Sequence, residues 1–278
     1  MPDNSSNSLQ GTLRKMTTHL GDVVQYALPL GEESLPLNPI IGNRLSLHFL
    51  GQIYCQSCGR KTNKSFSQGF CYPCMTKLAA CDMCILKPEQ CHYDKGTCRE
   101  PEWGETNCMT NHIVYLANTS ALKVGITRQS QVPTRWMDQG ATEALPIFRV
   151  ATRHISGLVE VEIAKLMADK TNWRAMLKGD GDSIPLKEKI LEVSPKISDI
   201  LAQVKRDHGD ESVESLDEPV VKIRYPVNEY PVKISSFNFD KMPDVSGTLV
   251  GIKGQYLIFD TGVINIRKFT GYDVRADY

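Results

Sequence analysis

The sequence predicts an α+β protein in which a cysteine-rich segment and two β-rich ends surround one small mixed unit. Three observations support this fold class. All nine cysteines lie between Cys55 and Cys108. Residues 109–178 alternate strand patterns with helical patterns, and both ends of the chain carry short β-like runs separated by Gly and Pro. A chain of 278 residues is long enough for two or three domains.

The first 54 residues predict a tail followed by strands. Residues 1–10 are polar and are expected to be disordered, and they lack the apolar core of a secretory signal. No apolar run approaches the length of a membrane span, so we expect a cytoplasmic protein that does not contact membranes. Residues 11–54 contain the runs "DVVQYALPL" and "RLSLHFLGQIY", which predict a β-rich N-terminal region.

Residues 55–108 are poor in aliphatic side chains and need another source of stability. Two C-x-x-C pairs, Cys55/Cys58 and Cys71/Cys74, are separated by twelve residues. Each pair lets two thiolates converge on one metal from a tight turn, and two pairs complete a tetrahedral zinc site. Because four thiolates leave no open position for water, the zinc is expected to be structural. Buried thiols without metal are the alternative.

A second set of cysteines follows. Its members are Cys81, Cys84, Cys91 and Cys98. We predict a second structural zinc here, and an iron–sulfur cluster is the alternative because it also takes four thiolates. The spacing matches neither ferredoxin pattern, which favours zinc. Cys108 is left over, His112 lies nearby, and His92 could replace Cys91 as a ligand.

Positive charge is concentrated in two segments, although the whole chain has a net charge of zero. Residues 55–80 carry four basic and no acidic side chains, and residues 109–178 carry nine basic and five acidic ones. Such an excess is where a nucleic acid would bind, whether DNA or RNA. A solvated mixed surface or a protein-docking surface is the alternative. The candidate contact residues are Arg60, Lys61, Lys64, Lys77 and Arg128.

The stretch "HIVYLANTSALKVGITR" predicts two strands joined by a three-residue turn at 118–120. In this register Tyr115 lies opposite Lys123 and points to the same side of the sheet. An ammonium beside a phenol should lower the phenol's pKa, so Tyr115 could act as a general base. Gly125 predicts the close approach of a phosphate or a neighbouring backbone, or else a bulge.

Two helices and a third strand follow the hairpin. "VPTRWMDQG" predicts a helix with Pro133 near its start and Gly140 just past its end, and "PIFRVATRH" predicts a strand. A second helix is expected over 156–169, with Ser156 as its N-cap. Its helical projection places Glu160 on the inward face and Glu162 on the outward face. A buried carboxylate needs a partner, which is a divalent metal, a lysine or an arginine, with the arginines 135, 149 and 153 as candidates.

The remainder of the chain predicts a helix, a linker and a β-rich end. Residues 184–206 are helical in pattern, and Pro195 should end or kink the helix. The acidic stretch within 179–219 is the best linker candidate. Residues 220–278 predict a small barrel or meander, with hairpin turns at Lys253-Gly254 and Asp260–Gly262. A further hypothesis is that the β-rich N-terminal and C-terminal regions form one sheet together.

The hairpin and its helices resemble a known superfamily. Ile113-Val114-Tyr115 and Lys123-Val124-Gly125, followed by Arg135 and Glu160, resemble the GIY-YIG nucleases, in the branch whose second motif reads K-[IV]-G-x-T. The likeness covers roughly 60 of the 278 residues. It implies a small antiparallel sheet with helices over residues 109–178. The chain also resembles an uncharacterised bacterial family that joins such a region to a cysteine-rich segment, which implies no activity.

The nuclease resemblance implies roles for four side chains. Tyr115, Lys123, Arg135 and Glu160 would be catalytic, with Glu160 holding one Mg²⁺ or Mn²⁺ ion and Arg135 contacting the scissile phosphate. The function hypothesis is therefore a zinc-containing nucleic-acid-binding protein with metal-dependent phosphodiester cleavage. One alternative is a non-catalytic zinc module that docks RNA, DNA or a protein partner. Another is an iron–sulfur or redox protein built on the second cysteine set.

Overall fold

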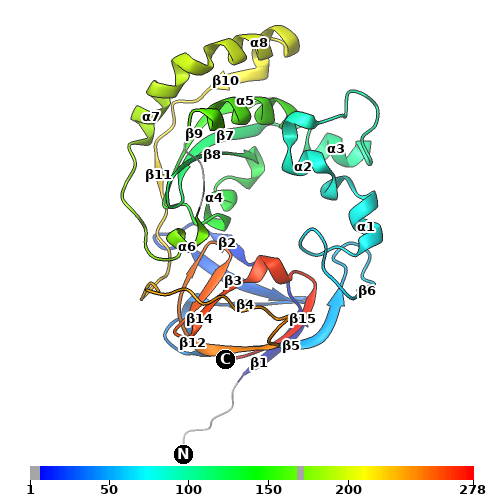
Figure 1. Cartoon of the computed structure of the whole chain (residues 1–278), viewed down its shortest axis with the longest axis vertical. Helices are drawn as coiled ribbons and strands as arrows, with labels where there is room; N and C mark the ends of the chain where they lie inside the picture. Colours follow the sequence, from blue (N-terminus) through cyan, green and yellow to red (C-terminus); the bar gives the residue numbers. More distant parts are fainter. Residues whose placement is uncertain (1–6, 168–171) are drawn as a thin grey trace, which may run out of the picture. The chain divides into compact units, whose positions relative to one another are not determined.

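A computed structural model describes residues 7–167 and 172–278 and confirms the α+β fold class (Figure 1). The described residues form two compact units. The first unit contains residues 7–75, Leu177–Gly179 and Arg224–Tyr278, and the second contains the described residues of Thr76–Met176 and Asp180–Ile223. The chain therefore crosses between the units several times, so the units do not follow the segments that composition suggests.

An antiparallel sheet in the order β1-β15-β5-β12-β13-β14 dominates the first unit, and β6 pairs with β5. A second sheet has the order β2-β3-β4. The bounds of the larger sheet are β1 Ser8–Thr12, β5 Arg44–Tyr54, β6 Lys61–Thr62, β12 Asp244–Lys253, β13 Tyr256–Phe259, β14 Gly262–Asn265 and β15 Tyr272–Asp277. Those of the smaller sheet are β2 Thr17–His19, β3 Gln25–Leu30 and β4 Glu33–Pro36.

Both ends of the chain lie in this one large sheet, which confirms the hypothesis that they pair. Ser8 lies opposite Asp277 in the β1–β15 ladder, and Leu47 of β5 lies opposite Ala276. The predicted tail over residues 1–10 is therefore wrong for residues 8–10, whose backbone groups pair with the last strand; residues 1–6 lie outside the described residues. Buried Leu45 and Leu47 alternate with more exposed side chains, which is the period of a half-buried strand.

The C-terminal region contains a meander, as predicted, but fewer strands than its pattern suggests. β12, β13 and β14 follow one another as antiparallel hairpins, with two-residue turns at Gly254-Gln255 and Asp260-Thr261. The run "YPVKISSF" forms no strand, and its one ladder contact is an isolated bridge from Ser236 to Val263. The run "VINIRKF" turns into a 3-10 helix after Asn265. Apolar runs of this length can pack without joining a ladder.

The second unit is built round a sheet in the order β10-β9-β7-β8, with β11 pairing β9. Its strands are β7 His112–Asn118, β8 Leu122–Arg128, β9 Glu143–Val150, β10 Val213–Ser215 and β11 Val221–Lys222. The helices of this unit are α2 Met83–Leu86, α3 Pro101–Asn107, α4 Thr134–Asp138, α5 Arg153–Lys165, α6 Trp173–Met176, α7 Leu186–Val193 and α8 Ser198–His208, and most of α1 Tyr72–Lys77 belongs to the first unit. A third strand after the hairpin is therefore confirmed.

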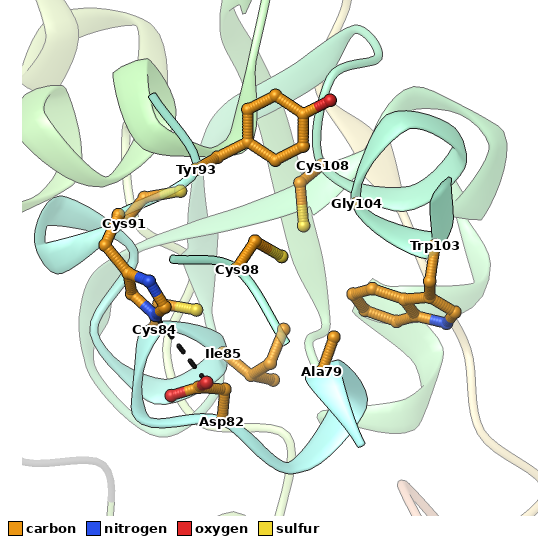
Figure 2. A pocket seen from close by; sticks show the side chains of 11 residues that line it. Ala79, Asp82, Cys84, Ile85, Cys91, Tyr93, Cys98, Trp103, Gly104 and Cys108 are labelled. Carbon is orange, nitrogen blue, oxygen red and sulfur yellow. Dashed lines mark ion pairs between the residues drawn. The ribbon is translucent and has the colours of Figure 1, made fainter. Parts of the chain in front are cut away.

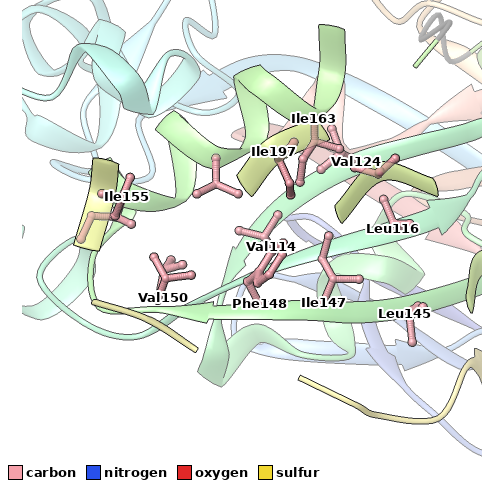
Figure 3. Close-up of a cluster of buried hydrophobic side chains, with 14 of the residues drawn as sticks. Val114, Leu116, Val124, Leu145, Ile147, Phe148, Val150, Ile155, Ile163 and Ile197 are labelled. Atoms are coloured by element: carbon pink, nitrogen blue, oxygen red, sulfur yellow. The ribbon is translucent and has the colours of Figure 1, made fainter. Parts of the chain in front are cut away.

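One face of this sheet packs under α5 (Figure 3). Val114 and Leu116 of β7 and Val124 of β8 are buried against Val159 and Ile163 of α5. Each such side chain contributes about 1.5–3 kcal/mol by leaving water. Because side chains alternate along a strand, the neighbouring positions face the other side of the sheet, away from this core.

The structure corrects the predicted helix over 156–169 and the predicted linker, and it confirms the break at Pro195. The helix α5 begins at Arg153 because Thr152 is its N-cap, accepting a hydrogen bond from the Ile155 amide at 3.2 Å. Ser156 is therefore not the cap, and the helix ends at Lys165, earlier than the predicted end at 169; residues 168–169 themselves lie outside the described residues. Pro195 lies in a 3-10 turn between α7 and α8, as expected. The acidic stretch is no free linker, because β10 within it pairs with β9.

Membrane spanning is not indicated by the helices. Among the residues that the structure describes, none of the helices combines the length and the apolar character that crossing a bilayer requires.

Candidate metal centre and carboxylate site

The first four cysteines come together in the first unit. The sulfur atoms of Cys55, Cys58, Cys71 and Cys74 all lie within 4.8 Å of one another, and those of Cys58 and Cys71 are 3.7 Å apart. When four thiolates surround a zinc ion tetrahedrally at about 2.3 Å, their sulfur atoms lie about this far from one another. The residues predicted from spacing therefore form a four-cysteine cluster that could bind zinc, which suggests a metal-binding module.

Local backbone geometry brings the thiols together. Cys55 directly follows β5, and a tight turn closes where its amide donates to the Arg60 carbonyl at 2.9 Å. Gly59 occupies the turn with φ of +68°, a conformation that favours glycine. The second pair begins α1, where the Met75 amide donates to the Cys71 carbonyl at 2.9 Å. Both pairs are thus presented from turns, as metal-binding C-x-x-C pairs require.

The surroundings of the cluster favour the thiolate form of Cys55 and the protonated form of Cys74. Burial raises the pKa of Cys55, but backbone amides of Cys58, Cys71 and Ser57 outweigh burial and lower it to about 6. Burial and hydrogen bonds to the neighbouring thiols raise the pKa of Cys74 to about 12. Four adjacent negative charges repel one another, so only a bound cation would allow all four to ionise.

The predicted basic contact residues are exposed in part and differ in what they touch. Arg60 interacts with the cysteine cluster. A hydrogen bond to Cys58 and attraction to the Cys58 thiolate raise the pKa of the Arg60 guanidinium. Lys64 lies over the Phe66 ring at 5.3 Å, and Lys61 and Lys77 are exposed. Arg128 belongs to the second unit, where it donates to Asn107 Oδ1 at 2.5 Å. Nucleic-acid contact by these residues stays a prediction.

The second cysteine set is only partly brought together. Cys84, Cys91 and Cys98 line one cavity in the second unit, and Cys108 is the fourth thiol in its wall (Figure 2). Cys81 is not among the residues that line it. The signal that sequence reasoning passed over was Cys108, which stood outside the regular spacing.

The hairpin register differs from the prediction. Tyr115 lies opposite Gly125, and Ala117 lies opposite Lys123. The three-residue loop is Thr119–Ala121, one position later than predicted, so the pairing of Tyr115 with Lys123 is wrong. A shift of two residues between partners keeps all of these side chains on their predicted face.

Tyr115 explains the glycine opposite it. A Cβ built on Gly125 would lie 2.7 Å from both Cζ and Oη of Tyr115. The ring is fully buried, 5.8 Å from the Trp136 ring, and its hydroxyl donates to Gln139 Oε1 at 2.8 Å. Gly125 therefore makes room for a side chain rather than for a phosphate or a bulge.

The predicted lowering of the Tyr115 pKa is also wrong. Burial raises the pKa of the phenol to about 12, although the nearby charge of Arg135 opposes this. Loss of hydration outweighs one cation because the phenolate would lie in the protein interior. A phenol with this pKa is a poor general base at neutral pH.

We predict that Gly125→Ala destabilises the protein by about 1–3 kcal/mol, as overpacking of a filled core does. The ring of Tyr115 cannot move aside because Trp136 and Gln139 hold it. Thermal unfolding should show a lowered Tm, and the same change in a Tyr115→Leu background should cost less. Gly21→Ala is the control, since its added Cβ meets nothing closer than 3.4 Å. An equal loss in both backgrounds would rule out Tyr115 as the cause.

Glu160 of α5 is half-buried among cationic side chains. Burial raises the pKa of its carboxyl to about 7, while the charges of Arg153, Lys123 and Arg135 oppose this rise and Glu89 adds to it. The charge of Arg135 lowers the pKa of Tyr115, and that of Glu160 raises it. Lys123 and Arg135 are thus close enough to act on the charge of Glu160, and the catalytic roles that the nuclease resemblance implies stay a prediction.

The partner candidates for Glu160 are now distinguished. Arg149 is 2.7 Å from Glu214 across the β9–β10 ladder, so it is engaged elsewhere. Arg153 lies seven residues before Glu160 on α5, which is two helical turns and the same face. Glu162 binds the exposed Lys165 at 2.6 Å. The inward and outward positions of the two glutamates agree with the helical projection.

The cysteine-rich segment of the second unit packs directly on α5. A Cβ on Gly157 would lie 2.5 Å from the Glu89 amide nitrogen and 2.6 Å from Pro88 Cβ. Only glycine permits this approach, which brings Glu89 to the helix that carries Glu160. Sequence reasoning named Arg153 as a possible partner of Glu160 but missed Glu89, because Glu89 stands in no recognised motif.

Comparison with known proteins gives one finding. The searches of curated proteins and of solved structures found no match. A family model described as a protein of unknown function (DUF2797) matches residues 42–274, which include both cysteine sets, the hairpin and α5. The resemblance to an uncharacterised cysteine-rich family is thereby confirmed, while the likeness to GIY-YIG nucleases stays a prediction. The chain belongs to the DUF2797 family.

Proposed function

We propose that this metal-binding protein binds nucleic acid, and that β8, α4 and α5 of its second unit hold a phosphodiester group for metal-dependent cleavage. One observation carries the proposal. Three cationic side chains, those of Lys123, Arg135 and Arg153, act on the half-buried carboxylate of Glu160. Their charge exceeds that of Glu160 and Glu89 together, so a bound anion would complete the balance.

Each residue type suits a phosphodiester. A guanidinium such as that of Arg135 matches two phosphate oxygens, and the ammonium of Lys123 adds a compact charge. Both side chains are half-buried, which leaves them partly accessible and only partly hydrated. The charges of this site are therefore stronger than those of a fully solvated surface.

The carboxylates supply the donor chemistry that Mg²⁺ or Mn²⁺ requires. Hard divalent cations prefer carboxylate oxygens, and Glu160 with Glu89 would hold such an ion. When bound, it would polarise a phosphoryl oxygen as a Lewis acid. A carboxyl with a pKa of about 7 can also exchange a proton at neutral pH, a property expected of a general base or acid.

Tyr115 favours a second candidate, a non-catalytic module that docks nucleic acid or a protein. Its phenol is fully buried, donates to Gln139, and has its pKa raised to about 12. In the proposed cleavage site it therefore positions α4 against the sheet instead of removing a proton.

The binding part of the proposal is tested with Arg135→Gln. Fluorescence anisotropy with short labelled single-stranded DNA and RNA should show salt-sensitive binding by the wild type. The variant should bind about tenfold more weakly, as loss of one charge-assisted hydrogen bond predicts, with a shallower salt dependence. Lys165→Gln is the matched control, because Lys165 is exposed on α5 and pairs with Glu162. Absence of binding by the wild type at low salt would exclude a nucleic-acid partner.

A further inference from the structure

The second unit contains a small cavity that is lined in part by thiols. Its volume is about 20 Å³, and Cys84, Cys91, Cys98 and Cys108 line it (Figure 2). In this view the sulfur atoms of Cys84 and Cys91 lie on one side of the space between the four side chains, and those of Cys98 and Cys108 lie on the other. A single buried cysteine packs as a small apolar side chain does, but four thiols that line one cavity also form a possible set of metal ligands.

Four separate pieces of backbone supply these thiols. Cys84 lies in α2, Cys91 follows the 3-10 turn Pro88–Gln90, Cys98 lies in the next loop, and Cys108 caps the end of α3. These elements are short, and they bury few apolar side chains of their own. Short elements with a small core need a disulfide or a metal to hold them together, and no disulfide is present among the described residues.

Asp82 and His92 are weaker ligand candidates, although each has an atom within 4.8 Å of the Cys84 sulfur. Asp82 accepts a hydrogen bond from the Met83 amide at 2.6 Å and is 2.7 Å from Arg99 Nε. Its carboxylate already serves as the N-cap of α2. His92 Nδ1 is 2.8 Å from Thr97 Oγ1 and its Nε2 is 3.6 Å from Asp82. Both side chains thus have partners of their own.

Cationic side chains lie near the cavity, although burial raises the pKa of the Cys108 thiol and raises that of Cys84 to about 11. Arg153 and Arg128 both act on the Cys108 sulfur, and Arg153 donates to the Ile85 carbonyl at 2.6 Å beside it. A centre with four thiolates and a divalent ion would carry two negative charges, which Arg128 and Arg153 would offset in part, because Arg153 also acts on Glu160.

We propose that Cys84, Cys91, Cys98 and Cys108 ligate a second metal centre, with Cys108 in the place that spacing assigned to Cys81. The chemistry is that of a thiolate-bound metal, which a zinc ion and an iron–sulfur cluster share. Cys81 instead belongs to the 3-10 turn Ala79–Cys81, from which Ala79 reaches the cavity wall. The centre joins α2, α3 and the turn before Cys91 into one body beside α5.

The test compares Cys108→Ser with Cys81→Ser in the full chain after anaerobic purification. Metal and acid-labile sulfide are measured per chain. Cys108→Ser should lose one metal centre relative to the wild type, while Cys81→Ser should keep both. Iron with sulfide and a visible charge-transfer band identifies a cluster, and a second equivalent of zinc identifies a single ion; either supports the ligand set. Loss in Cys81→Ser with retention in Cys108→Ser would overturn it.

Thiol labelling of the wild type keeps the proposal testable if Cys108→Ser fails to fold. Cys91 and Cys98 are half-exposed, so an alkylating reagent should reach them unless metal holds them. Mass spectrometry should show both protected in the loaded protein and modified after chelation. A wild type that holds one metal centre only, even after reconstitution with zinc or with iron and sulfide, would refute the proposal.

Discussion

Cys55→Ser should remove one zinc ion per chain and unfold the segment that the first four cysteines hold. Metal binding and folding are one equilibrium in such a segment, and a structural zinc contributes on the order of 10 kcal/mol to it. The loss should extend into the sheet, because Cys55 continues β5 and Ser65 Oγ donates to the Thr270 carbonyl at 2.9 Å beside β15. Metal analysis and limited proteolysis between residues 55 and 75 measure both effects.

Asn63→Ser is the matched control for Cys55→Ser, since Asn63 is exposed in the same segment and offers no thiol. It should keep the full zinc content and resist the protease. Removing zinc from the wild type with a chelator should reproduce the cleavage pattern of Cys55→Ser, and added zinc should reverse it. Unchanged zinc content in Cys55→Ser would mean that the four thiols are a buried cluster without metal.

Glu160→Gln should abolish any Mg²⁺- or Mn²⁺-dependent cleavage of nucleic acid, by about 100-fold or more, as loss of a general base or metal-binding carboxylate predicts. Binding of the nucleic acid itself should change little, because the three cations remain. The measurement is hydrolysis of labelled DNA and RNA with each metal, beside anisotropy without metal. Failure of the wild type to cleave would favour the non-catalytic module.

Glu162→Gln is the matched control for Glu160→Gln, because it removes a carboxylate from the outward side of the same helix. Glu162 binds the exposed Lys165 at 2.6 Å, so its loss should affect stability by less than about 1 kcal/mol and leave cleavage intact. Activity that survives in Glu160→Gln and disappears in Glu162→Gln would place the chemistry on the other face of α5.

The same pair of variants has a pH signature that does not need activity. Folding holds the pKa of Glu160 at about 7, above its ordinary value of 4.5, because burial penalises the carboxylate more than Arg153, Lys123 and Arg135 favour it. The folded state therefore binds this proton more tightly than the unfolded state does. Stability should fall as the pH rises from about 5 to about 7.

Glutamine at position 160 stays neutral and removes this dependence. In a chelating buffer the Tm of the wild type should fall relative to that of Glu160→Gln across the same pH interval, while Glu162→Gln follows the wild type. A difference that stays constant with pH would mean that Glu160 is ionised throughout and paired with Arg153.

Local features of the chain were predicted well from sequence. The first four-cysteine set depends on two tight turns of fixed length, so spacing alone located it. The helix between Pro133 and Gly140 and the break at Pro195 follow from backbone chemistry of single residues. The inward position of Glu160 follows from the period of one helix.

Predictions that needed a through-space distance were less successful. Regular spacing selected Cys81, whereas the cavity wall holds Cys108, which α3 brings back across the segment. The hairpin register depends on the ring of Tyr115 finding space over Gly125, a contact that neither strand specifies alone. Its pKa depends on burial by Trp136 of α4, which outweighs the expected help of a lysine.

The sequence by itself determined the α+β class, the zinc-type spacing of Cys55 to Cys74 and the candidate residues of the hairpin and α5. Each of these is a property of neighbours along the chain, such as a turn length or a helical period. Only the tertiary structure decided which thiols share a cavity, which cationic side chains act on Glu160 and that burial raises the pKa of Tyr115. Those outcomes depend on which distant elements pack together and how much water they exclude, because both charge interactions and proton affinity change steeply with burial.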